Sequence, residues 1–230
     1  MTATADLTVV CVKWGAKYGV DYVNILHDAV RRHLTVPHRF VCLTDDPTGI
    51  ACETEPLMSG LPYWWGKMVL FSHSLPGRKL FFDLDTVILD NIDGFARYTG
   101  PFCVVKPFYR DWGITSSVMS IAPGFGRESW EKFNRDPRAA IEYTHAHALP
   151  SWNNGDQRWL ELTIPRADYW QDQLPGQLYS YKVHCTKGLP PGAHVVCFHG
   201  KPMIHEVADD WVGQHWRITP PAQESGASSR

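Results

Sequence analysis

The sequence of 230 residues has no long apolar run, no C-x-x-C pair of cysteines and no excess of basic residues. A transmembrane helix needs about 20 consecutive apolar residues, so we expect no membrane span. The formal net charge is −2, and this balance offers no basic surface that would attract nucleic acid. The first residues, MTATADLTVV, have neither the basic flank nor the separate apolar segment of a signal peptide. These absences argue against membrane, nucleic-acid-binding and secreted proteins.

The six cysteines are scattered along the chain and form no zinc-binding pattern. Four of them lie in apolar, strand-like runs, where free buried thiols are common: Cys11, Cys42, Cys103 and Cys197. We therefore expect a reduced, cytoplasmic protein without a zinc site. Hydrophobic residues make up 44% of the chain and no linker divides it, which predicts one domain over residues 1–219. The polar segment 220–230 is expected to be a disordered tail.

Apolar runs alternate with helical patterns along the chain. In the first half, strands are predicted over 7–13, 38–44, 51–55 and the run that contains Asp83 and Asp85. Helices are predicted over 22–33, with Asp21 as the N-cap, and over 63–74. This βαββαβ order predicts an α/β sheet with parallel strands, whose ligands bind at the carboxyl ends of the strands. In the second half, strands are predicted over 102–106, 117–121 and 195–198, and helices over 128–134 and 156–162.

Residues 79–90, KLFFDLDTVILD, place two carboxylates at the end of an apolar run. On an extended strand alternate side chains share a face, so Asp83 and Asp85 would point one way and Leu84 the other. Neighbouring carboxylates repel each other and are costly to bury, and a divalent cation removes both penalties. Oxygen ligands suit Mg²⁺ and Mn²⁺, so a metal site is predicted here. The motif alone leaves open a strand-to-loop junction with two solvated acids.

A second group of polar residues follows the apolar run 195–198. His199 offers an imidazole as the third ligand of a manganese-like ion that two carboxylates already hold. Gly200 permits close approach of the backbone, and Lys201 offers a point charge to a phosphate. Taken alone, a histidine after a strand is more often an ordinary core or surface residue.

A third group, residues 152–157 with the sequence WNNGDQ, gathers amide and carboxylate side chains at a predicted helix start. Asp156 and Gln157 would suit a ligand rich in hydroxyl groups, because they combine hydrogen-bond donors and acceptors. The alternative is an Asn-Gly turn followed by Asp156 as a helix cap.

Together and in this order, the three groups resemble the retaining glycosyltransferases of family eight, which have the GT-A fold. Asp83-Leu84-Asp85 is similar to the D-x-D motif of that family, and Asp156-Gln157 to its Asp-Gln pair before a helix. The segment 115–119, TSSVM, is similar to the family's Asn-Ser-Gly-Val-Met strand. The segment 199–203, HGKPM, is similar to a shortened His-x-x-Gly-x-x-Lys-Pro-Trp motif. A Thr and a Met replace the family's Asn and Trp, which points to a divergent bacterial branch.

The resemblance implies a single Rossmann-like GT-A domain with a mixed, mostly parallel central sheet flanked by helices. Its nucleotide-binding half would span about residues 1–100, and its sugar and acceptor half about 101–219. The implied reaction is metal-dependent transfer of a hexose from a nucleotide-sugar, above all a UDP-sugar. The acceptor would be a hydroxyl group of a glycan or glycolipid, and the transfer would proceed with retention, in polysaccharide biosynthesis.

The resemblance also implies roles for individual residues. Mn²⁺ or Mg²⁺ would be held by Asp83, Asp85 and His199. The residues that would contact the donor nucleotide lie mainly in the first half of the chain, and Trp14 or Tyr18 would stack on the base. The contacts would come from Lys13, Trp14, Tyr18, Asp45, Lys67, Asp83, Leu84, Asp85, Gly200 and Lys201. Asp156 and Gln157 would face the transferred sugar, and Lys201 would stabilise the departing diphosphate. These last three are the candidate catalytic residues.

Two other classes of protein stay open. The run FFDLDTVIL also resembles the first motif of haloacid-dehalogenase-type phosphatases, in which Asp83 would be a nucleophile toward phosphate. That motif normally opens the chain, whereas about 80 residues precede it here, and no late Gly-Asp pair with a further acid follows. The second of these classes is a non-catalytic module that binds a nucleotide-sugar or a glycan.

Overall fold

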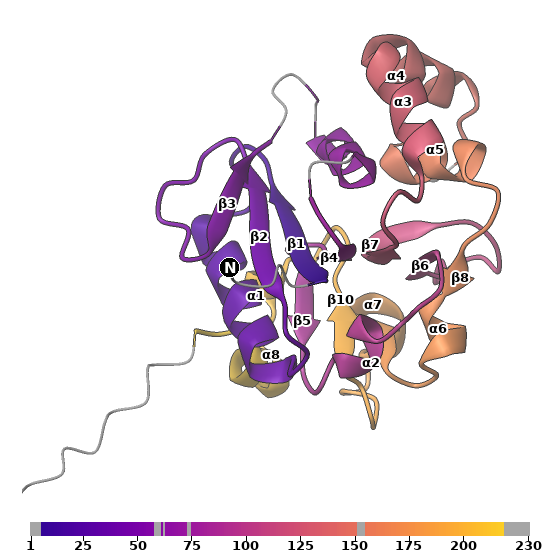
Figure 1. The fold of residues 1–230 in the computed structure, drawn as a ribbon. Helices are drawn as coiled ribbons and strands as arrows, with labels where there is room; N and C mark the ends of the chain where they lie inside the picture. The colour runs from indigo at the N-terminus through magenta and orange to yellow at the C-terminus, as the bar shows by residue number, and fades with distance from the viewer. Residues whose placement is uncertain (1–5, 58–60, 62, 73–74, 151–154, 219–230) are drawn as a thin grey trace, which may run out of the picture.

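The computed structural model describes residues 6–57, 61, 63–72, 75–150 and 155–218. Seven strands form its central sheet: β1 (Leu7–Lys13), β2 (Arg39–Thr44), β3 (Glu53–Pro56), β4 (Arg78–Phe82), β6 (Phe102–Val105), β7 (Thr115–Ile121) and β8 (Asp168–Tyr169). Their order is β3-β2-β1-β4-β7-β6-β8 (Figure 1). Only β7 runs antiparallel to its neighbours β4 and β6. The predicted single α/β domain with a mixed, mostly parallel sheet is confirmed. The predicted tail, 220–230, lies outside the described residues.

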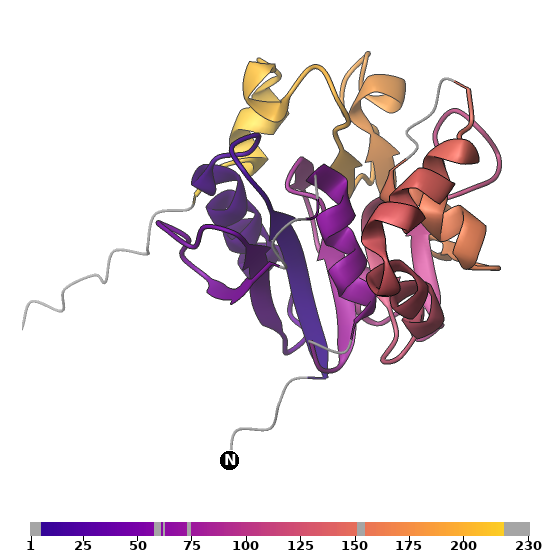
Figure 2. The same cartoon turned by 90° about the horizontal axis from the view of Figure 1, so that it is seen from above.

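Alternate residues of β1 point to opposite faces of the sheet and enter two different hydrophobic clusters. Val9 and Cys11 belong to the cluster under helix α1 (Val20–His33), whereas Val10 belongs to the cluster on the other face. That second face is covered by the 3₁₀ helix η1 (Tyr63–Phe71) and by α3 (Arg127–Arg135), α4 (Pro137–Ala146) and α5 (Asp156–Thr163). In Figures 1 and 2 these three α-helices lie together, away from α1. Helices thus flank the sheet on both faces.

A second sheet of three short strands brings the D-x-D segment next to the C-terminal motif. Its strands are β5 (Thr86–Ile88), β9 (Leu178–Ser180) and β10 (Val195–Cys197), in the order β5-β10-β9. β10 pairs antiparallel with β5, so Cys197 lies opposite Thr86. The N–H of Phe198 donates a hydrogen bond to the carbonyl of Asp85 at 2.9 Å. His199 therefore emerges from its strand directly beside the D-x-D segment.

The remaining elements are short: α2 (Asp93–Ala96), α6 (Trp170–Gln173), α7 (Tyr181–His184), η2 (Ile204–Glu206) and α8 (Asp210–His215). None of the helices in the described ranges is long and apolar enough to cross a membrane.

The start of α1 differs from the prediction. Its N-cap is Gly19, and Asp21 lies in the first turn, so the prediction of Asp21 as the cap is wrong. A Cβ atom at Gly19 would lie 2.3 Å from Oδ1 of Asp21, so any other residue at the cap would displace that exposed carboxylate. In the first turn the carboxylate still faces the positive end of the helix dipole.

Helix α4 was not predicted, although its start carries a clear signal. Asp136 is its N-cap and accepts a hydrogen bond from the N–H of Ala139 at 3.0 Å, and Pro137 occupies the first helical position. Both features are typical of helix starts. The pattern was missed because the helix buries few residues; within it only Ala140 and Thr144 are buried.

Two histidines lie where α8 packs against the end of α1. Arg32 donates a hydrogen bond to the carbonyl of His215 at 2.9 Å, and the rings of His33 and His215 are 6.4 Å apart. Burial, with the nearby charges of Arg32 and Arg217, lowers the pKa of His215. Burial, with Arg32 and His215, lowers the pKa of His33. Asp28 and Asp90 oppose these effects only in part. The folded protein therefore prefers both rings neutral.

We expect the melting temperature to fall as the pH drops below about 6.5, the usual pKa of histidine. The folded-state pKa values lie below that value, so the unfolded chain takes up protons first and the stabilisation is lost as the pH falls further. His215→Gln should show a smaller loss between pH 7 and pH 5, read by differential scanning calorimetry. The exposed His145→Gln is the matched control. Equal losses in all three proteins would contradict the prediction.

Candidate active site

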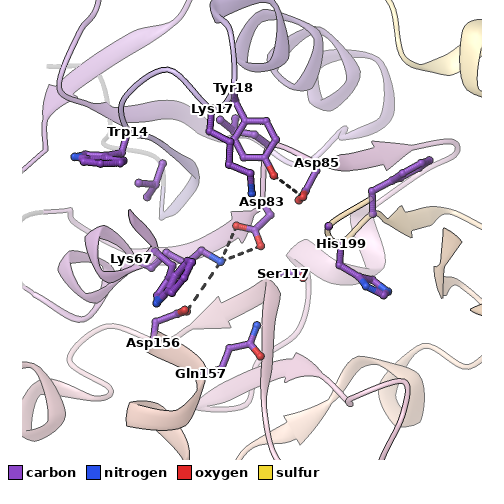
Figure 3. Close-up of a pocket in the computed structure, with 15 residues that line it drawn as sticks. Trp14, Lys17, Tyr18, Lys67, Asp83, Asp85, Ser117, Asp156, Gln157 and His199 are labelled. Carbon is purple, nitrogen blue, oxygen red and sulfur yellow. Dashed lines mark hydrogen bonds and ion pairs between the residues drawn. The ribbon is translucent and has the colours of Figure 1, made fainter. Parts of the chain in front are cut away.

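A cavity of about 480 Å³ opens at the carboxyl ends of β1 and β4 (Figure 3). Its walls come from the loop after β1, from η1, from the D-x-D segment, from β7, from the start of α5 and from the residues that follow β10. Most of the residues singled out in the sequence line it: Trp14, Tyr18, Lys67, Asp83, Leu84, Asp85, Asp156, Gln157, His199 and Gly200. Residues far apart in the sequence, from Val12 to Gly200, thus meet at one site.

The D-x-D segment forms a turn and not the expected strand, because β4 ends at Phe82. Leu84 is 2% exposed and packs in the core, while Asp83 and Asp85 face the cavity. The carbonyl of Ser117 accepts a hydrogen bond from the N–H of Asp83 at 2.8 Å, which anchors the turn to β7. The two carboxylates share one side even without a strand, because burial of Leu84 orients the turn.

Asp83 is bound by a lysine. Nζ of Lys67 lies 2.8 Å from Oδ1 and 2.9 Å from Oδ2 of Asp83. Burial raises the pKa of Asp83 to about 7; Lys67 opposes this rise and the nearby Asp85 adds to it. Burial acts to lower the pKa of Lys67, but the charges of Asp83 and Asp156 raise it overall. Lys67 therefore stays charged and compensates the buried carboxylates.

Asp85 is bound by a phenol. The hydroxyl of Tyr18 donates to Oδ2 of Asp85 at 2.6 Å, and Asp85 is 8% exposed (Figure 3). Burial raises the pKa of Asp85, while this hydrogen bond and the charges of Lys67 and Lys17 offset part of the rise. Burial, followed by the charge of Asp85, also raises the pKa of Tyr18. The phenol thus remains a hydrogen-bond donor at physiological pH.

Asp156 is the first residue of α5 and is 1% exposed. Its Oδ2 accepts a hydrogen bond from the hydroxyl of Ser116 at 2.6 Å and lies 4.0 Å from Nζ of Lys67. Its Oδ1 has no hydrogen-bond partner in the part of the chain that the structure describes. A buried carboxylate oxygen without a partner is costly, and a ligand hydroxyl in the cavity would satisfy it.

Gly155, the N-cap of α5, allows an indole to approach this site closely. A Cβ atom at Gly155 would lie 1.8 Å from Nε1 of Trp64, so a larger residue there would displace the indole. Trp64 lines the cavity and remains 43% exposed. Residues 152–154 of the WNNGDQ group lie outside the described residues.

His199 lies on the opposite side of the cavity from Lys67 (Figure 3). Its Nε2 forms a hydrogen bond with the hydroxyl of Ser180 at 2.8 Å, and its ring stacks against Phe108 at 6.1 Å. Burial lowers its pKa, and the charge of Lys182 lowers it further. The neutral imidazole that a metal ligand requires is thereby favoured.

The predicted metal ligands share the cavity without forming a closed cluster. Among the residues that can be described, no three His, Cys, Asp or Glu side chains are close enough to hold a metal ion. The donor set of Asp83, Asp85 and His199 nevertheless fits a divalent cation, because a cation would offset the cost of burial that raises the pKa of both carboxylates, and burial favours the neutral imidazole. To bind it, the carboxylates would have to turn partly from Lys67 and Tyr18.

Three of the predicted site residues lie away from the cavity wall. The Lys13 Nζ donates to the carbonyl of Gly15 at 3.3 Å, and the carboxylate of Asp45 accepts from the N–H of Gly15 at 3.0 and 3.2 Å. Both thus hold the loop after β1. The ammonium group of Lys201 bonds to Glu206, and its side chain is 74% exposed.

Several residues that line the cavity were not among the predicted site residues, above all Lys17, Trp64 and Ser117, although Ser117 lies in the segment 115–119 that resembles the family's strand motif. Lys17 lies between Trp14 and Tyr18 in a loop already expected to contact the nucleotide, and this position was the available signal. Trp64 carried no signal, because its approach to Gly155 depends on how η1 packs against α5.

No family model and no curated protein matches the sequence. Solved structures do share its fold. The glycosyltransferase GlyE of Streptococcus pneumoniae TIGR4 aligns with a TM-score of 0.62 at 13% identity, over 86% of this chain and 56% of GlyE. The galactosyltransferase LgtC, solved in complex with donor and acceptor sugar analogs, aligns with a TM-score of 0.60 at 11% identity, over 94% of this chain and 98% of LgtC. An active-site mutant of LgtC aligns with a TM-score of 0.59 at 10% identity.

These likenesses confirm the predicted GT-A fold, which this chain shares with both glycosyltransferases. The chain spans a little over half the length of the GlyE chain that it matches and nearly all of LgtC. At such low identities the comparison establishes architecture, and the reaction has to be argued from the site.

Proposed function

We propose that the protein is a metal-dependent glycosyltransferase that transfers a hexose from a UDP-sugar to a hydroxyl group of a glycan or glycolipid, with retention. The observation that carries the proposal is the cavity at the carboxyl ends of the strands in a GT-A fold. It gathers the buried carboxylates of Asp85 and Asp156 and the partly buried carboxylate of Asp83 within one space of about 480 Å³. A cavity of that size suits a small-molecule donor.

The charges of the cavity explain why a metal ion is part of the proposal. Two lysines and three aspartates line it, a formal charge of −1 when all are ionised. An anionic diphosphate would be repelled by this balance. A divalent cation held by Asp83, Asp85 and His199 would reverse the sign and, as a Lewis acid, stabilise the charge that develops on the leaving group. Lys67, which lies 2.8 Å from Asp83 and 4.0 Å from Asp156, would orient the Asp83 carboxylate in the cavity.

In the proposed reaction the bond between the sugar C1 and the diphosphate oxygen breaks, and the electron pair leaves with the nucleoside diphosphate. The hydroxyl oxygen of the acceptor forms the new bond to C1 on the same face, and its proton passes to the departing diphosphate. Asp156 would hold hydroxyl groups of the transferred sugar through its unpartnered Oδ1. Gln157, the next residue of α5, would lie near the anomeric carbon. Positioning and electrostatic stabilisation would then carry most of the rate enhancement.

Exposed aromatic residues beside the cavity support nucleotide and sugar ligands. Trp14 lines it and is 37% exposed, so its indole is available to stack on a nucleotide base. Tyr109 is 59% exposed and meets the ring of His199 edge-on at 5.9 Å. We assign the acceptor to this side of the cavity, where an aromatic face can pack against a sugar ring.

The experiment is incubation with Mn²⁺ and a panel of UDP-, GDP- and TDP-sugars, with release of free nucleotide as the readout. We expect release from a UDP-sugar, its loss in EDTA, and better recovery with Mn²⁺ than with Ca²⁺. Hydrolysis of simple phosphate esters with an acyl-phosphate on Asp83 would establish the phosphatase instead. A thermal shift with nucleotide-sugars but no turnover would establish a binding module.

A further inference from the structure

The loop that follows β1 is fixed in one shape by its own neighbours. Gly15 has a φ of 58°, a conformation that favours glycine. Its carbonyl accepts a hydrogen bond from Lys13, and its N–H donates to Asp45. Lys13 is 8% exposed, whereas the bonds between Gly15 and Asp45 lie at the surface. The two residues after the anchor, Ala16 and Lys17, therefore leave β1 in a defined direction.

Lys17 reaches into the cavity from this loop (Figure 3). Its Nζ lies 4.7 Å from the centre of the Tyr18 ring, and the hydroxyl of Tyr18 is bound to Asp85. The ammonium group is thus held above the aromatic ring that touches the D-x-D segment.

Among the lysines near the site, Lys17 alone lines the cavity without an acidic partner in the described ranges of the chain. Lys67 is bound to Asp83 through both carboxylate oxygens. Lys201 is bound to Glu206 and is not part of the cavity wall. An ammonium group already paired with a carboxylate has to give up that partner before it can bind a phosphate, which lowers its contribution.

We propose that Lys17, and not Lys201, is the lysine that neutralises the diphosphate of the donor in this protein. The assignment rests on the proposed function, because it presumes a nucleoside diphosphate in the cavity. The compact charge of an ammonium group suits the spread negative charge of a diphosphate. The aromatic ring beneath Lys17 stabilises the cation without competing for the anion.

The test is the affinity for UDP compared with that for uridine, which lacks the phosphates, by isothermal titration calorimetry with Mn²⁺ present. Lys17→Met should weaken UDP binding about 10- to 100-fold, the usual effect of one charged contact, and leave uridine binding unchanged. Lys17→Arg should retain most of the affinity for UDP, because it keeps the charge. Lys201→Met and the exposed Lys187→Met should change the affinity for UDP less than about twofold. Melting temperatures of all variants check that they fold.

The assignment is overturned if Lys201→Met weakens UDP binding and Lys17→Met does not. It is also overturned if Lys17→Met weakens UDP and uridine equally, since Lys17 would then act on the base. A wild-type protein that binds neither UDP, GDP nor TDP overturns the proposed function and the assignment of Lys17 with it. Binding of UDP by the wild-type protein with no effect of Lys17→Met overturns the assignment of Lys17 alone.

Discussion

The Asp85→Asn protein is expected to stay folded and to lose transfer activity by at least about 10³-fold in kcat/KM. Asparagine has the shape of aspartate and can still accept the hydrogen bond of Tyr18, but it removes the charge that would hold a divalent cation. Because burial raises the pKa of Asp85, removing its charge also relieves a desolvation cost. The melting temperature measured in EDTA should therefore be equal to or above that of the wild-type protein.

Asp46→Asn is the matched control for this experiment. Asp46 also follows a strand of the central sheet, but its carboxylate accepts a hydrogen bond from the N–H of Thr48 at 3.0 Å and lies in an exposed turn. Its activity should equal that of the wild-type protein. Full activity of Asp85→Asn in the presence of a chelator would contradict the metal assignment, and the role of the D-x-D segment would then have to be structural.

The Asp156→Asn protein should lose about 10²–10³ in kcat while binding UDP and Mn²⁺ with unchanged affinity. Asp156 lies on the side of Lys67 away from Asp85, and its Oδ1 has no partner within the described residues, so its proposed contacts are with the transferred sugar. An amide can still accept the hydrogen bond of Ser116, which limits structural damage. Kinetics with saturating donor measure the loss in kcat, and calorimetry with UDP measures the affinity for the nucleotide.

The control for a merely structural role is Asp136→Ala, because Asp136 is a true helix cap on α4 and alanine removes the capping oxygen. That variant should lose melting temperature and keep its activity, the reverse of Asp156→Asn. By NMR, the product formed from an α-linked donor should have the same anomeric configuration as the donor. An inverted product together with rescue of Asp156→Asn by external bases would make Asp156 a catalytic base and would refute the retaining mechanism.

Much of the architecture could be read from local patterns. The apolar runs predicted β1 and β2 almost to the residue, and the helical spacing predicted most of α1. These elements bury a regular set of side chains, so their period is visible in a few consecutive residues. The predicted GT-A fold, which rested on motifs spread over the whole chain, is confirmed by the likeness to GlyE and LgtC.

Short elements escaped prediction for the opposite reason. β5 and β9 have three residues each, too few for a period to show, and neither was predicted as a strand of its own; β10 lies within the strand predicted over 195–198 and pairs with both. Their pairing nevertheless decides the site, because it places His199 beside Asp85. In the sequence, His199 was recognisable only as a chemically suitable third metal ligand. That suitability does not specify its distance from Asp85.

The sequence was sufficient to identify most of the residues that line the cavity, because three groups of polar side chains in one order resembled the motifs of one family. It was not sufficient to assign partners. The sequence predicted that Lys67 contacts the donor, and in the fold Lys67 pairs with Asp83 and Asp156. It predicted that Lys201 contacts the diphosphate, and in the fold Lys201 pairs with Glu206. A side chain's partner depends on what lies across space within a few ångströms, and no pattern along the chain encodes that distance.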